Sequence, residues 1–235
     1  MAGSMNRTLD VATSHLASVL RFGAGWTARP GRKLPEAPLV LYEFEACPYC
    51  RKVREALTTF DLDAVIYPCP RGSRYRDVVK AKGGKLQFPY LVDPNTGSAL
   101  YESDDIIRYL AETYGDGRVP IALSLGPLTT ATSGLASLAR TGRGSEATPA
   151  TEPAQPLELW SFEFSPYCRI VREALAELTL PYRLHNVGRH SASRAAFREM
   201  SGKMMVPYLV DPNTGVRMFE SADIVAYLER TYAAP

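Results

Sequence analysis

Hydrophobic and polar residues alternate over residues 39–45, a stretch rich in Leu, Val, Tyr and Phe, and this pattern predicts a β-strand. A helix is predicted directly after it. Pro48 stands where a first-turn proline belongs. Beyond it, Val53, Ala56 and Leu57 recur at the spacing of one helical face. The junction between this strand and this helix falls at the first cysteine of the chain.

Further elements are predicted as far as residue 114. They are a strand at 64–67, a helix at 75–82 that Gly83 and Gly84 end, a hairpin of strands at 89–92 and 99–101, and a helix with Ser103 as its N-cap. The order is strand, helix, strand, helix, strand, strand, helix. This order predicts an α/β unit.

The same pattern occurs a second time in the chain. Residues 39–114 align with residues 157–232 without a gap, and roughly half of the aligned positions are identical. We call these segments the first and the second repeat. The repeat predicts two domains, at 5–118 and 122–235, each long enough to bury its own core.

A patterned segment precedes each repeat. Leu9, Thr13 and Leu16 fall on one face of a short amphipathic helix, and residues 128–139 repeat that segment. The stretch 119–155 is rich in Gly, Ser, Thr and Pro, as linkers are. Because its first half repeats the N-terminal pattern, we interpret it as structure and expect a short helix before each domain.

Charge and hydropathy exclude several classes of partner. The chain has 27 basic and 25 acidic residues, well interspersed, and a net charge of +2. This balance argues against binding to nucleic acid or to an anionic membrane surface. No apolar run approaches the roughly 20 residues of a membrane span. We therefore expect neither nucleic acid nor a membrane as a partner.

The cysteines indicate a reducing compartment. Two of the four stand in a C-x-x-C motif, a pattern that suits redox chemistry better than a disulfide scaffold. The expected location is the cytoplasm. Residues 1–35 hold four arginines and one acid, so an organelle such as a plastid is the alternative.

Cys47 and Cys50 form a dithiol at the start of a predicted helix. Unpaired backbone N–H groups and the helix dipole stabilise a thiolate there, so Cys47 is predicted to attack and Cys50 to resolve. Arg51 and Arg54 act in the same direction, whereas two nearby glutamates, Glu43 and Glu45, oppose it. Structural zinc needs four ligands, and neither a second C-x-x-C nor a histidine pair follows, so no metal is expected.

The second repeat carries Ser165 in place of the first cysteine, in the motif S-P-Y-C. A serine hydroxyl cannot attack a disulfide. It can donate a hydrogen bond to a thiolate held next to it. The alternative is a degenerate site that is kept for packing.

The combination of C-P-Y-C after a strand, a proline that opens a later strand, and Glu-Ser before the last helix resembles the glutaredoxins and the N-terminal domain of glutathione S-transferases. The resemblance covers residues 39–114 and 157–232. It implies a thioredoxin-like fold, an α/β domain with a mixed four-stranded sheet flanked by helices, in each repeat. The chain also departs from the transferase pattern, because we expect no all-helical domain after the last repeat, and this argues against conventional conjugation.

The resemblance also implies a set of glutathione-binding residues. Pro89 and Pro207 are expected in the cis form beside the site, with the backbone of Phe88 and Val206 pairing with the cysteine of glutathione. The Glu-Ser pairs are expected to hold its γ-glutamyl end, although helix capping explains them too and is compatible with binding. The set consists of Tyr49, Phe88, Pro89, Glu102 and Ser103 in the first repeat, and of Ser165, Tyr167, Val206, Pro207, Glu220 and Ser221 in the second.

The function predicted from these residues is a glutathione-dependent thiol–disulfide oxidoreductase with Cys47 and Cys50 as its catalytic pair. Glutathione is its co-substrate, disulfide or glutathionylated proteins are its expected partners, and the second domain is a pseudo-active glutathione binder. One alternative is a transferase-like glutathione-binding protein that uses Ser165. The other is a non-enzymatic scaffold in which glutathione and Cys47 bind an iron–sulfur cluster.

Overall fold

The computed structural model describes residues 7–19, 24–29, 31, 33–124, 140 and 142–234. In the first repeat the predicted order of elements is confirmed. The elements are β1 (Leu39–Glu43), α2 (Pro48–Thr59), β2 (Ala64–Pro68), α3 (Tyr75–Gly83), β3 (Tyr90–Asp93), β4 (Ser98–Leu100) and α4 (Ser103–Thr113).

The second repeat has the same order. Its elements are β5 (Leu157–Ser161), α7 (Pro166–Glu177), β6 (Tyr182–Asn186), α8 (Arg194–Ser201), β7 (Tyr208–Val210), β8 (Arg217–Phe219) and α9 (Ser221–Tyr232). A short helix α5 (Ile121–Ser124) follows the first repeat, and α1 (Arg7–Val19) confirms the predicted N-terminal helix. The matching helix predicted within 128–139 lies outside the described residues.

The residues predicted to begin and end the helices do so in most cases. Pro48 and Pro166 lie in the first turns of α2 and α7, and Gly84 ends α3 with a φ of 76°. The prediction that Ser103 is the N-cap of α4 is wrong. Strand β4 ends at Leu100, and the chain turns sharply at Glu102, whose φ is 64°. Glu102 is therefore the N-cap, and Ser103 is already the first residue of the helix.

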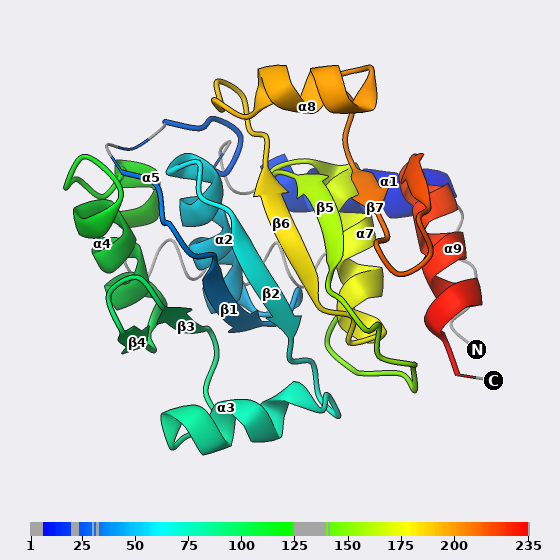
Figure 1. The fold of residues 1–235 in the computed structure, drawn as a ribbon, viewed down its shortest axis with the longest axis horizontal. Helices are drawn as coiled ribbons and strands as arrows, with labels where there is room; N and C mark the ends of the chain where they lie inside the picture. The colour runs from blue at the N-terminus through cyan, green and yellow to red at the C-terminus, as the bar shows by residue number, and fades with distance from the viewer. Residues whose placement is uncertain are drawn as a thin grey trace.

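In the described part of the chain, eight strands form a single sheet in the order β4-β3-β1-β2-β6-β5-β7-β8, of which Figure 1 labels β1 to β7. Within each repeat the first two strands, β1 with β2 and β5 with β6, pair in parallel. The hairpin strands pair antiparallel with each other, and β3 and β7 also pair antiparallel with β1 and β5. The repeats join where β2 pairs antiparallel with β6, with Ala64 opposite Leu184 and Ile66 opposite Tyr182. Neither β2 nor β6 is therefore an open edge. The domain limits 5–118 and 122–235 stay predictions.

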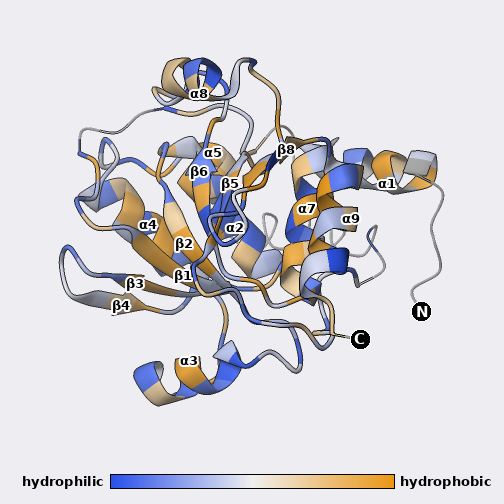
Figure 2. Cartoon of the chain, turned by 45° about the vertical axis from the view of Figure 1, so that its right-hand side comes forward, coloured by the Kyte–Doolittle hydropathy of each residue, from blue (hydrophilic) through white to orange (hydrophobic). Residues whose placement is uncertain are grey.

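One hydrophobic core runs under both repeats. Alternate strand residues such as Leu39 and Leu41 face α2 and α4, and Leu157 and Leu159 face α7 and α9 in the same cluster. Two smaller clusters lie on the other face of the sheet, one under α3 and one under α8. These two helices lie at opposite ends of the molecule in Figure 1, and the central strands β1 and β2 are mostly hydrophobic in Figure 2.

The segments that precede the repeats cross between them. Helix α1, which precedes the first repeat, packs against α7 of the second. Trp26 and Ala28 exchange backbone hydrogen bonds with Arg189 of the second repeat, at 2.8 and 2.7 Å. Ser145 and Ala147, which precede the second repeat, pair in the same way with Arg71 of the first. The part of segment 119–155 that the structure describes is thus built into the fold.

Among the described residues, no helix is both long enough and apolar enough to cross a membrane.

Candidate functional site

The dithiol lies at the N-terminus of α2. Cys47 occupies the N-cap position, and its Sγ accepts the backbone N–H of Cys50 at 3.3 Å. A hydrogen bond from the Cys50 thiol lowers the pKa of Cys47, and backbone hydrogen bonds from Cys50 and Tyr49 act in the same direction, while burial and the charge of Glu43 oppose them. Cys47 is therefore the sulfur better suited to be a thiolate.

Cys50 has the opposite character. Its side chain is fully buried, and burial raises its pKa well above the usual value, with the hydrogen bond to Cys47 acting in the same direction. One thiol is thus favoured as an anion and the other as a proton donor to it. This division suits an attacking and a resolving cysteine, and these roles of Cys47 and Cys50 stay predictions.

The cis-proline loop lies beside the dithiol. The Phe88–Pro89 peptide bond is cis, as predicted. Phe44, which precedes the motif, contacts Phe88 edge to face with a centroid distance of 6.0 Å. The Gln87 side chain donates a hydrogen bond to the carboxylate of Glu102. The segment that precedes the dithiol, the cis-proline loop and the Glu-Ser corner are therefore linked by direct contacts.

The Glu-Ser corner has an unusual backbone in both repeats. Glu102 and Glu220 have φ of 64° and 67°, a left-handed conformation that few residues other than glycine adopt. Such strain tends to occur at ligand-binding sites. In both repeats it turns the chain so that a helix begins at the next residue, Ser103 or Ser221. The free N–H groups of a helix N-terminus are suited to a carboxylate.

In the second repeat five of the six predicted residues line a pocket of 270 Å³, and Ser165 is not among its lining residues. The Ser165 hydroxyl occupies the N-cap of α7 and accepts the N–H of Cys168 at 3.3 Å. The Val206–Pro207 bond is cis, as predicted. The pocket is lined by Tyr167, Met205, Val206, Pro207, Glu220 and Ser221.

The N-terminal segment contributes to the surroundings of this second site, which the sequence did not indicate. The hydroxyl of Ser14 donates to the backbone oxygen of Pro166 at 2.9 Å, and the ring of His15 packs edge-on against Tyr167. Trp26 stacks on Phe164, with ring centroids 5.6 Å apart. Residues that precede the first repeat thus flank the serine motif of the second.

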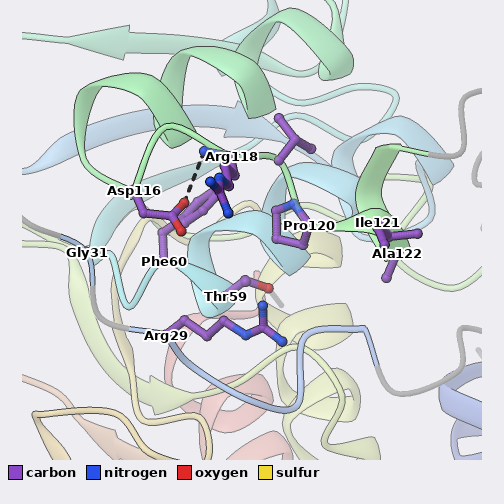
Figure 3. Close-up of a pocket in the computed structure, with 10 residues that line it drawn as sticks. Arg29, Gly31, Thr59, Phe60, Asp116, Arg118, Pro120, Ile121 and Ala122 are labelled. Atoms are coloured by element: carbon purple, nitrogen blue, oxygen red, sulfur yellow. Dashed lines mark hydrogen bonds between the residues drawn. The ribbon is translucent and has the colours of Figure 1, made fainter.

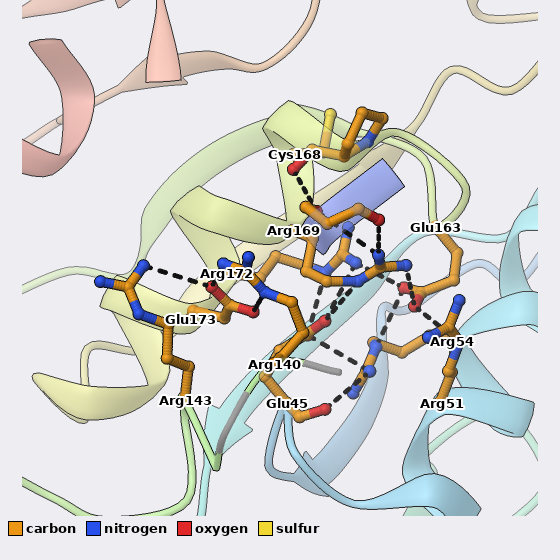
Figure 4. Close-up of polar contacts among 12 residues, drawn as sticks. Glu45, Arg51, Arg54, Arg140, Arg143, Glu163, Cys168, Arg169, Arg172 and Glu173 are labelled. Carbon is orange, nitrogen blue, oxygen red and sulfur yellow. Dashed lines mark hydrogen bonds and ion pairs between the residues drawn. The ribbon is translucent and has the colours of Figure 1, made fainter. Parts of the chain in front are cut away.

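A buried cluster of charges joins the two sites (Figure 4). Arg54 contacts Glu163 at 3.0 Å across the repeat boundary, and Arg172 contacts Glu163 at 2.8 Å and Glu45 at 3.0 Å. Arg140 contacts Glu173 at 2.7 Å. Arg54, which was expected to stabilise a thiolate, is thus engaged mainly by carboxylates.

Two glycines bring the backbone against this cluster. Gly25 and Gly144 have positive φ, and a Cβ atom there would lie 2.7 Å from Cβ of Glu163 and 2.8 Å from Cβ of Glu45. The repeat was the signal that could have revealed the cluster, because its glutamates and arginines recur in equivalent pairs. The pairs are Glu45 and Glu163, Arg51 and Arg169, Arg54 and Arg172, and Glu55 and Glu173.

The cluster shifts the pKa of its acids in opposite directions. Burial raises the pKa of Glu163, but the nearby Arg172, Arg54, Arg51 and Arg169 lower it to about 2. Burial raises the pKa of Glu43 to about 7, and Arg54 offsets this only in part. The first repeat therefore holds a carboxylic acid that exchanges protons near neutral pH.

A cavity of 480 Å³ lies away from the thiols (Figure 3). Thr59 and Phe60 line it at the end of α2 opposite Cys47, together with Arg29, Arg118 and Ile121. A helix of this length separates its two ends by about 18 Å. None of the predicted site residues lines this cavity.

No group of three or more His, Cys, Asp or Glu side chains in the described part of the chain is arranged to hold a metal ion.

In each repeat, the strand order, the cis proline and the capped motif helix define a thioredoxin-like fold. The family model of the glutathione S-transferase N-terminal domain matches residues 41–118 and again 159–235. The chain therefore belongs to this family and contains its domain twice.

Other comparisons add little. A solved structure titled "Leishmania TDR1 - a unique trimeric glutathione transferase" is 14% identical and is matched over 85% of this chain and 68% of that one. Its TM-score of 0.31 is too low to support an argument. No curated protein matches the chain.

Proposed function

We propose that the first repeat is a glutathione-dependent thiol–disulfide oxidoreductase. The observation that carries this proposal is the opposed character of the two thiols. Cys47 accepts hydrogen bonds that lower its pKa, and Cys50 is buried with a raised pKa. In a pair of this kind the first sulfur attacks the substrate disulfide, and the second attacks later to resolve the mixed disulfide.

The reaction follows from this arrangement. The Cys47 thiolate attacks a disulfide, forms a mixed disulfide with one half and expels the other half as a thiolate. Cys50 loses its proton and attacks Cys47, which forms the Cys47–Cys50 disulfide and releases the second thiolate. Two glutathione molecules then reduce the Cys47–Cys50 disulfide to the dithiol and are themselves oxidised to glutathione disulfide. With glutathionylated substrates, attack by Cys47 alone suffices.

The surroundings of the dithiol support glutathione as the reductant. The cis Pro89 directly precedes β3, and the N-terminus of α4 at Ser103 suits a carboxylate. Tyr49 is about half exposed on the first turn of α2, where a ligand can contact it.

The test compares single cysteine variants. Cys47→Ser should abolish glutathione-dependent reduction of disulfides, whereas Cys50→Ser should keep turnover of glutathione mixed disulfides. Cys168→Ser is the matched control, because Cys168 holds the position of Cys50 in the second repeat and is equally buried. Equal losses in the Cys47 and Cys50 variants, with folding intact, would contradict the assignment.

A second candidate function rests on the pocket of the second repeat. We infer that this repeat binds glutathione without exchanging it. The Ser165 hydroxyl is placed at the helix N-cap as Cys47 is, and a pocket of 270 Å³ lies among five of the predicted ligand contacts. A hydroxyl at this position can hydrogen-bond the glutathione sulfur but cannot form a disulfide with it.

A further inference from the structure

Glu43 is the member of the charge cluster that the second repeat lacks. It ends β1, its side chain is buried, and it accepts a hydrogen bond from Arg54. The equivalent residue at the end of β5 is Ser161. The repeat that has two motif thiols therefore also has the buried carboxylate, and the repeat that has one thiol does not.

Glu43 lies on the side of α2 that carries Cys50. Arg54 follows Cys50 by four residues, so the two side chains occupy the same face of α2 one turn apart. Arg54 binds the Glu43 carboxylate, which places that carboxylate under this face. Cys50 and Glu43 are both removed from water here, so a proton that leaves the Cys50 thiol needs a buried acceptor.

Glu163 of the second repeat competes with Glu43 for the positive charge of Arg54. The Arg54 guanidinium also binds the Glu163 carboxylate at 3.0 Å and the backbone oxygen of Glu45 at 3.2 Å. Arg54 therefore does not neutralise Glu43 alone. The charged and titratable groups that face Glu43 are Arg54, Cys50 and Cys47 of the motif helix, Glu45, Cys69 after β2, and Glu163, Arg172 and Tyr182 of the second repeat.

We propose that Glu43 exchanges a proton with Cys50 during thiol exchange, and that Glu163 of the second repeat is a positioning residue that acts on Glu43 through Arg54. The proposal deepens the proposed function and rests on it. In the resolving step the Cys50 proton passes to the Glu43 carboxylate, the Cys50 sulfur bonds to the Cys47 sulfur, and the bond from Cys47 to the bound thiol breaks. The departing thiolate takes the electron pair, and Glu43 later returns the proton to solvent.

A release assay without glutathione tests this step. Cys47 is converted to a mixed disulfide with 5-thio-2-nitrobenzoate, and the attack of Cys50 then releases the coloured thiolate in a single turnover. Cys50→Ser identifies the phase, because it should abolish the release. In the wild type the rate should level off above about pH 7, where Glu43 is ionised.

Glu43→Gln should slow this release at pH 7 by about tenfold or more, and its rate should keep rising with pH because only solvent then accepts the proton. Glu55→Gln is the matched control. It also removes a buried carboxylate from the first repeat, but one on α2 whose partner is Arg51 at 3.3 Å. It should keep the wild-type pH profile. A Glu43→Gln profile that matches the wild type would overturn the role of Glu43.

The cross-repeat part has its own test. Glu163→Gln removes a negative charge that raises the pKa of Glu43, so the midpoint of the release profile should move to lower pH. If this variant does not fold, Glu163→Asp shortens the reach to Arg54 and should move the midpoint the same way. An unchanged midpoint in the folded variant would overturn the role of Glu163.

A second readout separates a proton-transfer role from a structural one. In the Cys50→Ser background, Glu43→Gln should not slow the reduction of glutathione mixed disulfides, since Cys50 is not involved and removal of the Glu43 charge, which raises the pKa of Cys47, favours the Cys47 thiolate. An equal loss in both backgrounds would overturn the proposal. Failure of the Cys47→Ser test would instead count against the proposed function, because the release assay contains no glutathione and reports on Glu43 independently.

Discussion

In the first repeat the side chain that caps the motif helix is a thiol, Cys47, and in the second it is a hydroxyl, Ser165. Both accept a backbone N–H from the residue three positions later at 3.3 Å. The scaffold of the site is therefore the same in both. The difference teaches that this geometry alone does not define an exchange site, because the reactive sulfur and the buried acid Glu43 occur only in the first repeat.

The largest difference in stability between equivalent substitutions in the two repeats is expected in the charge cluster. Arg54→Met should lower the free energy of unfolding by about 3–5 kcal/mol, because it removes the arginine that binds the buried Glu43 carboxylate and one of the arginines that bind the buried Glu163. Arg172→Met should cost less, since the neutral Ser161 stands where the first repeat has Glu43. Urea denaturation measures both.

Arg71→Met is the control for this pair of variants. Arg71 also makes an ion pair across the repeat boundary, with Glu146 at 3.4 Å, but both side chains are exposed. Its loss should cost less than about 0.5 kcal/mol. Similar losses of unfolding free energy in all three variants would mean that burial of the cluster does not account for its contribution to stability.

Ligand binding tests whether the second site has kept its function. In a Cys47→Ser, Glu102→Ala background, calorimetry should still detect glutathione, which binds among Val206, Glu220 and the α9 N-terminus. Adding Glu220→Ala should weaken this binding by about tenfold or more, as expected for a lost charge-assisted contact. Adding Glu229→Ala, an exposed acid on α9, should not. Absence of binding in the starting background would make the second site a structural remnant.

Restoring the thiol sharpens the comparison. Ser165→Cys, assayed in the Cys47→Ser background, should give a small gain in exchange activity, with Cys168 placed to resolve the disulfide. Adding Ser161→Glu should raise it further, because the new acid would lie near Arg172 as Glu43 lies near Arg54. If the double substitution is no better than Ser165→Cys alone, the acid is not what distinguishes the two repeats.

The smallest effect is expected at the strand boundary. His185 of β6 contacts Asp63 and Glu158, each at 2.9 Å, whereas the equivalent residue of the first repeat is Tyr67. Burial lowers the pKa of His185, but hydrogen bonds to these carboxylates raise it overall above the usual histidine value of about 6.5. Because the folded-state pKa is the higher one, the stabilisation is complete below about pH 6.5 and is lost as the pH rises through that raised value.

His185→Gln should therefore destabilise the protein by less than about 1 kcal/mol at pH 5.5, since both carboxylates are partly exposed. The difference from wild type in urea denaturation should shrink toward pH 8. A difference that grows with pH would contradict this sign.

Local patterns were sufficient to predict the elements of both repeats. The alternation at 39–45, the glycines after α3 and the prolines at the motif helices all act within a few residues. The N-cap of α4 was missed because Glu102 adopts a backbone conformation that is rare for its residue type. The cis prolines were predicted by resemblance and not from local chemistry.

The contacts within the charge cluster and the pairing of the shared sheet are long-range, so the pattern of one repeat does not predict them. Only the recurrence of the same glutamates and arginines in both repeats marks the residues of the cluster. Arg51, Arg54 and Glu55 lie away from the apolar face of α2, so a helical pattern assigns them to solvent. They are buried because the second repeat covers that face. In the same way, nothing in the sequence of β2 indicates that β6 will pair with it.

The placement of α1 has a consequence for synthesis on the ribosome. Its partner α7 begins at residue 166, so about 150 residues are translated after α1 before the two can meet. At 5–20 residues per second, this delay is roughly 8–30 s. During that time the first repeat is complete in the nascent chain, while the apolar face of α1 has no docking surface. The N-terminal helix α1 is thus the first of the described elements to be synthesised and among the last to dock on its partner.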